Sequence, residues 1–253
     1  MLAIPCPSMD AEEAKYFTKM SSVWWDTKGP YRTQFFFDSM IVPFIIEQIV
    51  NNQKSRHENF SDDQPLNGLK ILEIGCGGGI VTEKMSRKGG DITGIDVNLA
   101  IINVAKNHLK LDPTITNVEY RLQSVEEHCL DNFEKYDVII LNTVLQHIVD
   151  KEPFLQCCIK CLKPGGSAFI GGMSQTWMGW FVGIFLAELL GILPRGTSDW
   201  NKFITLEGIG RIVEKFKCRF VDSRGMFYNV LTGNFFYLKS TSVTFIGHFR
   251  KDI

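Results

Sequence analysis

A glycine-rich segment after an apolar stretch gives the clearest chemical signal in the sequence. Glu73 lies near the end of the apolar stretch Lys70–Ile74, and Gly75, Gly77 and Gly79 follow it. Glycine lets the backbone turn sharply and lets a ligand come close to the main chain. The order E-x-G-x-G-x-G differs from the G-x-G-x-x-G of dinucleotide sites, which hold a pyrophosphate at a helix N-terminus. Glu73 offers negative charge to a cationic ligand, and a plain structural turn is the alternative explanation.

A second acid, Asp96, ends the next apolar stretch of the sequence. It stands about 20 residues after Gly75, the spacing at which an acid accepts hydrogen bonds from ribose hydroxyls. The alternative is that Asp96 caps a helix over residues 98–110, because aspartate is a good N-cap residue. A ribose beside a cationic group indicates S-adenosylmethionine, which carries a sulfonium, an amine and a carboxylate.

Other polar side chains follow the third and fourth apolar stretches. Ligands in open α/β sheets bind beyond the carboxyl ends of the strands, so we expect Asn142 and Thr143 to face the ligand. Ser124 is a candidate near the adenine, with a turn serine as the alternative. His147, a few residues later, could take a proton as a neutral imidazole, or it could be a helix-start histidine that packs against the next strand.

The elements that must position these residues alternate between short apolar strands and helices. Helices are expected over residues 80–88, 98–110 and 152–162. Strands are expected at Lys70–Ile74, Asp91–Ile95, Val118–Leu122, Tyr136–Leu141, Ser167–Gly171, Cys218–Arg224 and Val243–Arg250. Such alternation builds right-handed crossovers, so it predicts a doubly wound, mostly parallel α/β sheet of seven strands.

Composition excludes several classes of function. Lys plus Arg number 27 and Asp plus Glu number 28, so the chain offers no basic surface for nucleic acid. Seven cysteines without regular spacing are typical of reduced thiols, and we expect Cys158 and Cys161 to be core residues of a helix. The first thirty residues contain acids and no arginine, so no transit peptide is predicted there.

Two further motifs resemble those of known enzymes. Leu162–Ser167, which reads Leu-Lys-Pro-Gly-Gly-Ser, and Tyr136–Ile140 together resemble the Class I, Rossmann-like S-adenosylmethionine-dependent methyltransferases. From about Tyr16 to Phe249 the chain is also similar to the ubiquinone-biosynthesis O-methyltransferase family. The segments that carry this similarity are Val23–Asp26, Val42–Ile45, Gly75–Gly89, Val125–His128, Leu193–Thr197, Lys202–Ile204 and Tyr228–Thr232.

The resemblance implies an enzyme that methylates a hydroxyl of a polyprenylated dihydroxybenzoate or of demethylubiquinol. Its donor would be S-adenosylmethionine, held by Glu73, Gly75, Gly77, Asp96 and Asn142. It further implies peripheral contact with a membrane, other ubiquinone-biosynthesis proteins as partners and, in a eukaryote, the matrix side of the mitochondrial inner membrane. A methyltransferase with another small acceptor and a non-catalytic donor- or lipid-binding subunit are the alternatives.

The acceptor end departs from the family pattern. Related enzymes carry a motif that resembles E-x-x-E-H and is thought to hold Mg²⁺, whereas this chain has Thr143–His147, without either carboxylate. No metal site is therefore predicted, and His147 is the candidate catalytic base, with His248 and Asp199 as alternatives. Ile41 stands where the family usually has an arginine that helps to hold the donor.

The domain boundaries follow from this alignment of elements. Residues 1–67 are expected to form an N-terminal helical extension, with helices over 10–22 and about 36–50, and a polar linker. Residues 68–253 are expected to form the methyltransferase domain, with a hydrophobic insert over about 173–235. Within the insert, Trp177–Leu193 could be a buried helix, an interfacial segment or the lining of a tunnel for the isoprenoid tail.

Overall fold

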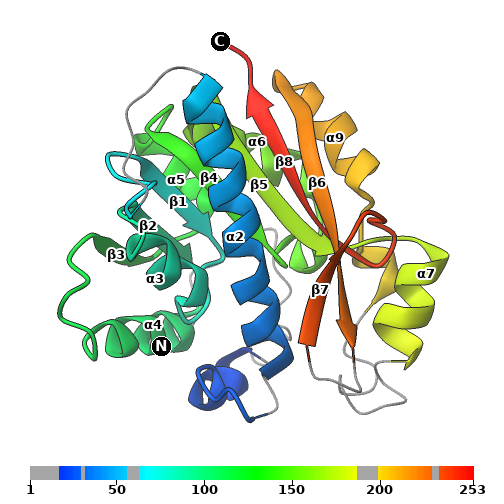
Figure 1. Ribbon diagram of the computed structural model, residues 1–253, viewed down its shortest axis with the longest axis horizontal. Coiled ribbons are helices and arrows are strands. Elements are labelled where there is room, and N and C mark those ends of the chain that lie inside the picture. Colours follow the sequence, from blue (N-terminus) through cyan, green and yellow to red (C-terminus); the bar gives the residue numbers. More distant parts are fainter. Residues whose placement is uncertain (1–16, 30–31, 56–62, 187–198, 230–233) are drawn as a thin grey trace.

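The computed structural model describes residues 17–29, 32–55, 63–186, 199–229 and 234–253. Its centre is an eight-stranded sheet in the order β3-β2-β1-β4-β5-β8-β6-β7 (Figure 1). The strands are β1 (Lys70–Ile74), β2 (Asp91–Asp96), β3 (Val118–Leu122), β4 (Tyr136–Asn142), β5 (Leu162–Met173), β6 (Cys218–Asn229), β7 (Asn234–Leu238) and β8 (Thr244–Lys251). β1 to β5 pair in parallel, and β8 pairs antiparallel with β5 and β6. The doubly wound α/β fold class is thereby confirmed.

Helices cover both faces of the sheet, as the strand-helix alternation predicted. α2 (Arg32–Ser55), α3 (Ile80–Ser86) and α4 (Leu99–Leu109) lie on the near face in Figure 1. α5 (Val125–Asp131), α6 (Lys151–Cys161) and α9 (Leu206–Glu214) lie behind it. The central strands are apolar at consecutive positions because both faces are buried under helices.

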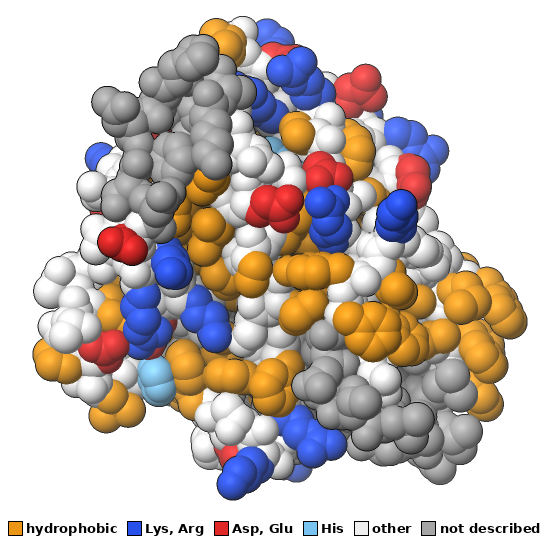
Figure 2. Space-filling model, viewed as in Figure 1, with side chains coloured by type: hydrophobic (Ala, Val, Ile, Leu, Met, Phe, Trp, Pro, Cys, Tyr) orange, Lys and Arg blue, Asp and Glu red, His pale blue; other side chains and the backbone are white. Residues whose placement is uncertain are grey.

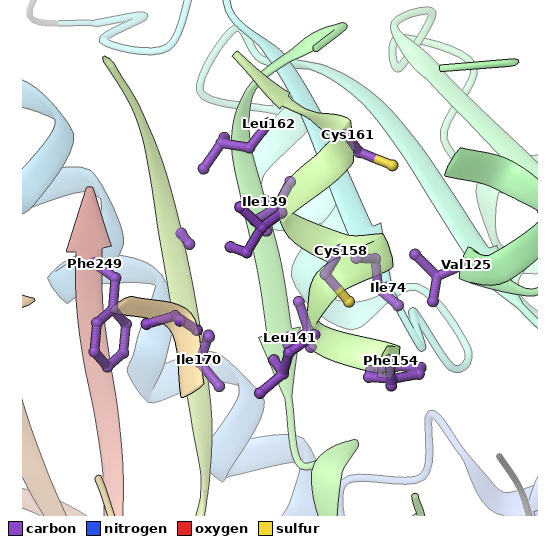
Figure 3. Packing of buried hydrophobic residues seen from close by; sticks show 14 of the residues in the cluster. Ile74, Val125, Ile139, Leu141, Phe154, Cys158, Cys161, Leu162, Ile170 and Phe249 are labelled. Carbon is purple, nitrogen blue, oxygen red and sulfur yellow. The ribbon is translucent and has the colours of Figure 1, made fainter. Parts of the chain in front are cut away.

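The core on the far side of the sheet joins α5, α6 and α9 to the central strands (Figure 3). Leu72 of β1 and Ile139 of β4 point into it, and both are fully buried. Cys158 and Cys161 of α6 belong to the same cluster and carry free thiols, so their predicted core role is confirmed. Burial raises the pKa of the Cys161 thiol to about 12, which keeps it protonated.

α2 packs diagonally across the near face of the sheet, so this N-terminal part of the chain shares a hydrophobic core with the strands. Its side chains Ile41, Phe44 and Ile45 are buried in one cluster with Ile71 of β1 and Val138 of β4. By length and composition, Arg32–Asn52 is also apolar enough to cross a membrane. The helix is longer than the predicted range 36–50, because residues 51–55 of the expected linker continue it.

The predicted strand count was wrong by one. β7 forms a hairpin with an extension of β6, and this pairing makes β6 five residues longer than the range 218–224. β7 lies at the edge of the sheet, and its Phe236 and Tyr237 are partly exposed, so the segment lacks the buried pattern of the other strands.

The predicted insert over 173–235 overlaps the sheet. Its first residue ends β5, and α9, β6 and the first residues of β7 belong to the central architecture. Between β5 and α9 lie α7 (Trp177–Trp180), a π-helical turn η3 (Phe181–Leu186) and η4 (Trp200–Lys202). Residues 187–198, which include the motif Leu193–Thr197 and the second part of the hydrophobic segment, lie outside the described residues.

Candidate functional site

The candidate site lies where β1, β2 and β4 end side by side. Ile74 is in register with Ile95 of β2 and with Leu141 of β4. The residues that follow these three positions are Gly75, Asp96 and Asn142, so the topology brings the predicted ligand-binding residues to one edge of the sheet. β1 and β4 flank the point where the chain reverses its direction of winding, and open α/β sheets bind ligands at such a point.

The glycine segment after β1 forms a tight turn before α3. Gly75 and Gly77 have φ angles of 70° and 53°, which side chains with a Cβ rarely adopt. A Cβ at Gly77 or Gly78 would also collide with the indole of Trp24, which packs directly on the turn. Trp25 donates a hydrogen bond from Nε1 to the Gly78 carbonyl at 2.9 Å. The turn is therefore covered by an aromatic segment of the N-terminus, a contact that the sequence reasoning missed.

Asp96 faces this turn and keeps hydrogen-bonding capacity for a ligand. Its Oδ2 accepts a bond from the Gly77 amide at 3.1 Å, and its Oδ1 accepts one from the Asn98 amide at 2.9 Å. Each carboxylate oxygen can accept a further bond. The alternative role as helix cap is excluded, because the Asn98 side chain caps α4 by accepting from the amides of Ala100 and Ile101.

Glu73 lies behind the turn and is buried, with 5% of its surface exposed. The Thr82 hydroxyl of α3 donates a hydrogen bond to its Oε2. Desolvation by burial, with smaller contributions from the neighbouring acids Asp38 and Asp96, raises the pKa of Glu73 to about 8. Without a cation beside it, this carboxyl is mostly protonated at neutral pH.

A chain of side chains links the end of β4 to α2. Asn142 donates from Nδ2 to Oδ1 of Asp38 at 2.8 Å, and Gln34 donates to the same oxygen at 2.7 Å. Gln34 also reaches the Thr143 hydroxyl at 3.1 Å. Thr143 has a φ of 56°, and such backbone strain in a non-glycine residue clusters at functional sites. Asp38 and Gln34 were missed in the sequence, where only their spacing of one helical turn marks them.

His147 lies at the end of η2 (Leu145–His147), the turn that follows β4. Its ring is half-buried and meets the Phe17 ring edge-on, with centroids 5.0 Å apart. It is also close enough to Asp96 to lower the pKa of that carboxyl, although burial has the larger and opposite effect. His147 and the ribose candidate Asp96 thus lie near each other.

Two buried amide oxygens point to a ligand at the acceptor end of the crevice. Among the described residues, no donor reaches the side-chain oxygens of Asn142 and Gln146. A buried acceptor without a partner is costly, so such atoms are rare in folded proteins. Together with the glycine turn and the acids Glu73, Asp38 and Asp96, they suit a ligand with amine and sulfonium groups. These residues therefore fit S-adenosylmethionine as a ligand.

The other residues considered for the site have structural roles elsewhere. Ser124 caps α5 in a reciprocal capping box with Glu127. Asp199 is exposed and caps η4. His248 is buried between α2 and the sheet, where it contacts Gln48 and Ser167, and burial lowers its pKa to about 4. A base must reach the substrate, so the structure excludes His248 from that role.

The residues at the Mg²⁺ position of related enzymes do not fit a metal ion here. The Thr143 hydroxyl donates to the Asn142 carbonyl at 2.7 Å, and Gln146 offers a neutral amide. Within the described ranges, no group of three or more His, Cys, Asp or Glu side chains could hold a metal. Mg²⁺ prefers carboxylates and phosphates, so no step is derived through a metal.

Comparisons with known proteins identify the family of the chain. A family model described as a methyltransferase domain matches residues 72–170. The ubiquinone biosynthesis O-methyltransferase of Rattus norvegicus mitochondria is 34% identical over 243 residues, which are 95% of this chain and 69% of that protein. The bacterial protein of the same name from Methylobacterium sp. (strain 4-46) is 32% identical, with 95% of this chain and 94% of that protein covered. The chain spans only 65% of the human relative.

Solved structures support the fold. Magnesium protoporphyrin IX methyltransferase from Synechocystis PCC 6803, with bound SAH, superposes with a TM-score of 0.64 at 14% identity and covers 94% of both chains. A SAM-dependent methyltransferase from Aquifex aeolicus gives a TM-score of 0.57 at 14% identity, with 94% of this chain and 97% of that chain covered. At these identities the match concerns the architecture alone, in which the crevice at the ends of β1, β2 and β4 is embedded.

Proposed function

The chain belongs to the ubiquinone biosynthesis O-methyltransferases, which use S-adenosylmethionine, and we propose that it methylates a hydroxyl of a prenylated dihydroxybenzoate or demethylubiquinol. The observation that carries the proposal is the meeting of Gly75, Asp96 and Asn142 at one edge of the sheet. The family names supply the pathway, and this geometry supplies a donor site in the same chain.

The donor site assigns a separate task to each predicted residue. Asp96 accepts hydrogen bonds from the ribose hydroxyls, and the amide-lined turn at Gly75 and Gly77 lies against the methionine end. Glu73 and Asn142 complete the site with a buried acid and with an amide oxygen that has no partner among the described residues. When bound, S-adenosylmethionine supplies an electrophilic methyl group on a positively charged sulfur.

His147 is the proposed base for the acceptor. A phenol has a pKa near 10, so it needs a base to become a good nucleophile at neutral pH. A ring nitrogen of His147 takes the hydroxyl proton as the phenol oxygen forms its bond to the methyl carbon, and the sulfur keeps the electron pair of the broken bond. Its closeness to Asp96 supports this role, since Asp96 is assigned to the bound donor.

An exposed aromatic surface supports contact with a membrane. Trp177, Trp180 and Phe185 are 67%, 42% and 46% exposed, and stacking joins Trp177 to Phe181 and Trp180 to Phe185. Figure 2 shows hydrophobic side chains gathered over α7 and near β7. Tryptophan is favoured at the headgroup level of bilayers, and a polyprenylated acceptor is itself dissolved in lipid. The described half of the hydrophobic segment is thus not a buried helix.

The proposed place of action follows from relatives of two kinds, mitochondrial and bacterial. In a eukaryotic cell we place the chain at the matrix face of the mitochondrial inner membrane. Protease protection of intact, ruptured and carbonate-washed mitochondria tests this: the chain should resist protease in intact organelles and be released by carbonate. Digestion in intact mitochondria would place it elsewhere.

An assay with labelled donor tests the reaction. The purified chain, S-adenosylmethionine with a labelled methyl group and a short-chain prenylated dihydroxybenzoate should give a labelled methyl ether on a ring oxygen. Label transfer to an unprenylated catechol alone would favour a different acceptor. Donor binding without turnover on any quinone precursor would favour the non-catalytic subunit.

Vesicle binding tests the membrane surface separately from the chemistry. The double substitution Trp177→Ser and Trp180→Ser should reduce co-sedimentation with phosphatidylcholine-cardiolipin vesicles by roughly tenfold, because two large apolar side chains are lost from the interface. Leu130→Ser is the matched control, since Leu130 is 78% exposed on α5, away from this surface. Equal effects of the two changes would contradict a specific docking surface.

A further inference from the structure

Asp38 of α2 is an ionisable group that lies beside Asn142 at the end of β4 and that the assigned roles leave unused. Gln34 and Asn142 both donate to its Oδ1, at 2.7 and 2.8 Å. Asn142 is the last residue of β4, so its amide holds the carboxyl at the same edge of the sheet as the glycine turn.

The surroundings of Asp38 contain more negative than positive groups. Glu73 on β1 and Asp96 on β2 are acids, and the pKa of Glu73 is raised by both Asp38 and Asp96. Lys84 on α3 is the cation that acts on Asp38, and its effect ranks below burial and both hydrogen bonds. Burial also lowers the pKa of Lys84 itself. Glu73 is buried and Asp38 and Asp96 are partly buried, so three carboxyls lie near one another without matching positive charge within the described protein.

Asp38 and Glu73 are therefore partly neutral in the ligand-free protein. Desolvation raises the pKa of Asp38 to about 7 and that of Glu73 to about 8. A positive charge placed beside a carboxyl favours its ionised form and lowers its pKa. A ligand with a cationic centre between these acids would expel their protons when it binds.

We propose that Asp38 is a third carboxyl of the donor site, which ionises together with Glu73 when the sulfonium of S-adenosylmethionine binds. This role rests on the donor site described above and deepens it. S-Adenosylhomocysteine has the same nucleoside, amine and carboxylate but a neutral sulfur. Asp38 consequently favours the charged donor over the neutral product and helps the product to leave after methyl transfer.

Isothermal titration in two buffers measures the protons released on binding. Phosphate and Tris have different ionisation enthalpies. The apparent binding enthalpies in the two buffers therefore differ by the number of protons released multiplied by the difference between these ionisation enthalpies. At pH 7 S-adenosylmethionine should release roughly one proton, since Asp38 is half protonated and Glu73 mostly protonated. S-Adenosylhomocysteine should release less than half as much. At pH 9.5 both acids are ionised beforehand, so the release should largely disappear.

Variants assign the released proton to Asp38. Asp38→Asn keeps an oxygen for Gln34 and Asn142, and it should lower the release by about half a proton. It should also weaken S-adenosylmethionine roughly tenfold while the affinity for S-adenosylhomocysteine changes little. Glu47→Gln is the matched control on the same helix, because Glu47 is exposed and lies near Arg224. Its release should equal that of the unmodified protein.

A second variant moves the release in the opposite direction. The bond from Gln34 lowers the pKa of Asp38, so Gln34→Ala should leave that carboxyl more protonated and increase the release at pH 7. A merely structural role for Asp38 would not produce this increase. Unchanged release and unchanged donor preference in Asp38→Asn would overturn the inference. Failure of both nucleosides to bind the unmodified protein would instead overturn the donor site itself.

Discussion

The donor half of the site and its acceptor half are built differently. The donor half comprises Asp38, Glu73, Gly75, Gly77, Asp96 and Asn142, and the acceptor half comprises Thr143, Gln146 and His147. In the donor half, the Gly77 amide donates a hydrogen bond to the Asp96 carboxylate, and the strands that precede these two residues pair in register. In the acceptor half, the buried oxygen of Gln146 has no partner among the described side chains, and His147 contacts Phe17 from the N-terminus. The donor half is thus built mainly on the ends of neighbouring strands, with Asp38 added from α2, whereas the acceptor half draws on segments that are distant in the sequence.

This difference separates the part of the function that follows from the fold from the part that depends on individual side chains. Strand ends in register place the glycine turn and Asp96 wherever the fold forms, so donor binding follows from topology. The acceptor half depends on a strained residue, Thr143, and on side chains from α2 and η2. Catalysis and acceptor choice can therefore change in this half without loss of the donor site.

Removing the proposed base should give the largest effect and should leave the donor half intact. We expect His147→Ala to lower kcat by about 10²–10⁴-fold, the usual contribution of a general base, with little change in the KM for the donor. Rate measurements against pH should also lose the limb that depends on the base. Asp199→Asn is the control, because Asp199 only caps η4. Comparable losses in the two variants would remove the reason to place the base at His147.

A substitution of Glu73 in the donor half should change the free energy of unfolding as well as the binding of the donor. Glu73 has a folded pKa of about 8 against an ordinary 4.5, so its contribution is favourable at low pH and is lost as the pH rises through 8. We expect Glu73→Gln to stabilise the ligand-free protein by about 4 kcal/mol at pH 8 and by less than about 1 kcal/mol at pH 5. Urea unfolding at the two pH values measures this.

The stability test needs a charge-matched control. Glu152→Gln removes an exposed acid that pairs with Lys215 and should change the free energy of unfolding by less than about 1 kcal/mol. If Glu73→Gln destabilised the protein equally at both pH values, the buried carboxyl would be a structural hydrogen-bonding group and not an acid held ready for a cation.

Much of the donor half could be predicted from the sequence. The glycine turn and Asp96 can be recognised from their short spacing in the sequence. The structure brings Glu73, Gly75, Asp96 and Asn142 to one edge of the sheet as expected. Asp38 could not be found this way, because its partner Asn142 is 104 positions away along the chain. His248 is the opposite case. Its residue type suits a catalytic base, but its side chain proved to be buried in the core.

Loss of the ribose contacts should have an intermediate effect. We expect Asp96→Ala to weaken S-adenosylmethionine by about 1–3 kcal/mol, because hydrogen bonds to a charged group are lost. The same change should leave the affinity for the prenylated acceptor nearly unchanged. Direct titration of each ligand measures both values, and an unaltered donor affinity would contradict the assignment of Asp96.

Metal removal should have the smallest effect of all. Because Thr143 and Gln146 stand where related enzymes have carboxylates, we expect EDTA to leave the initial rate of methyl transfer unchanged. Loss of activity with EDTA and its recovery with Mg²⁺ would show that the acceptor half holds a metal after all. The two halves would then be more alike than their side chains indicate.

The most direct test is a crystal structure of the chain grown with S-adenosylhomocysteine. We predict a ribose within hydrogen-bonding distance of Asp96, with the homocysteine end between the glycine turn and Asn142. A nucleoside bound at another place, or NADH bound at the ends of β1 and β4 in a parallel soak, would contradict the account.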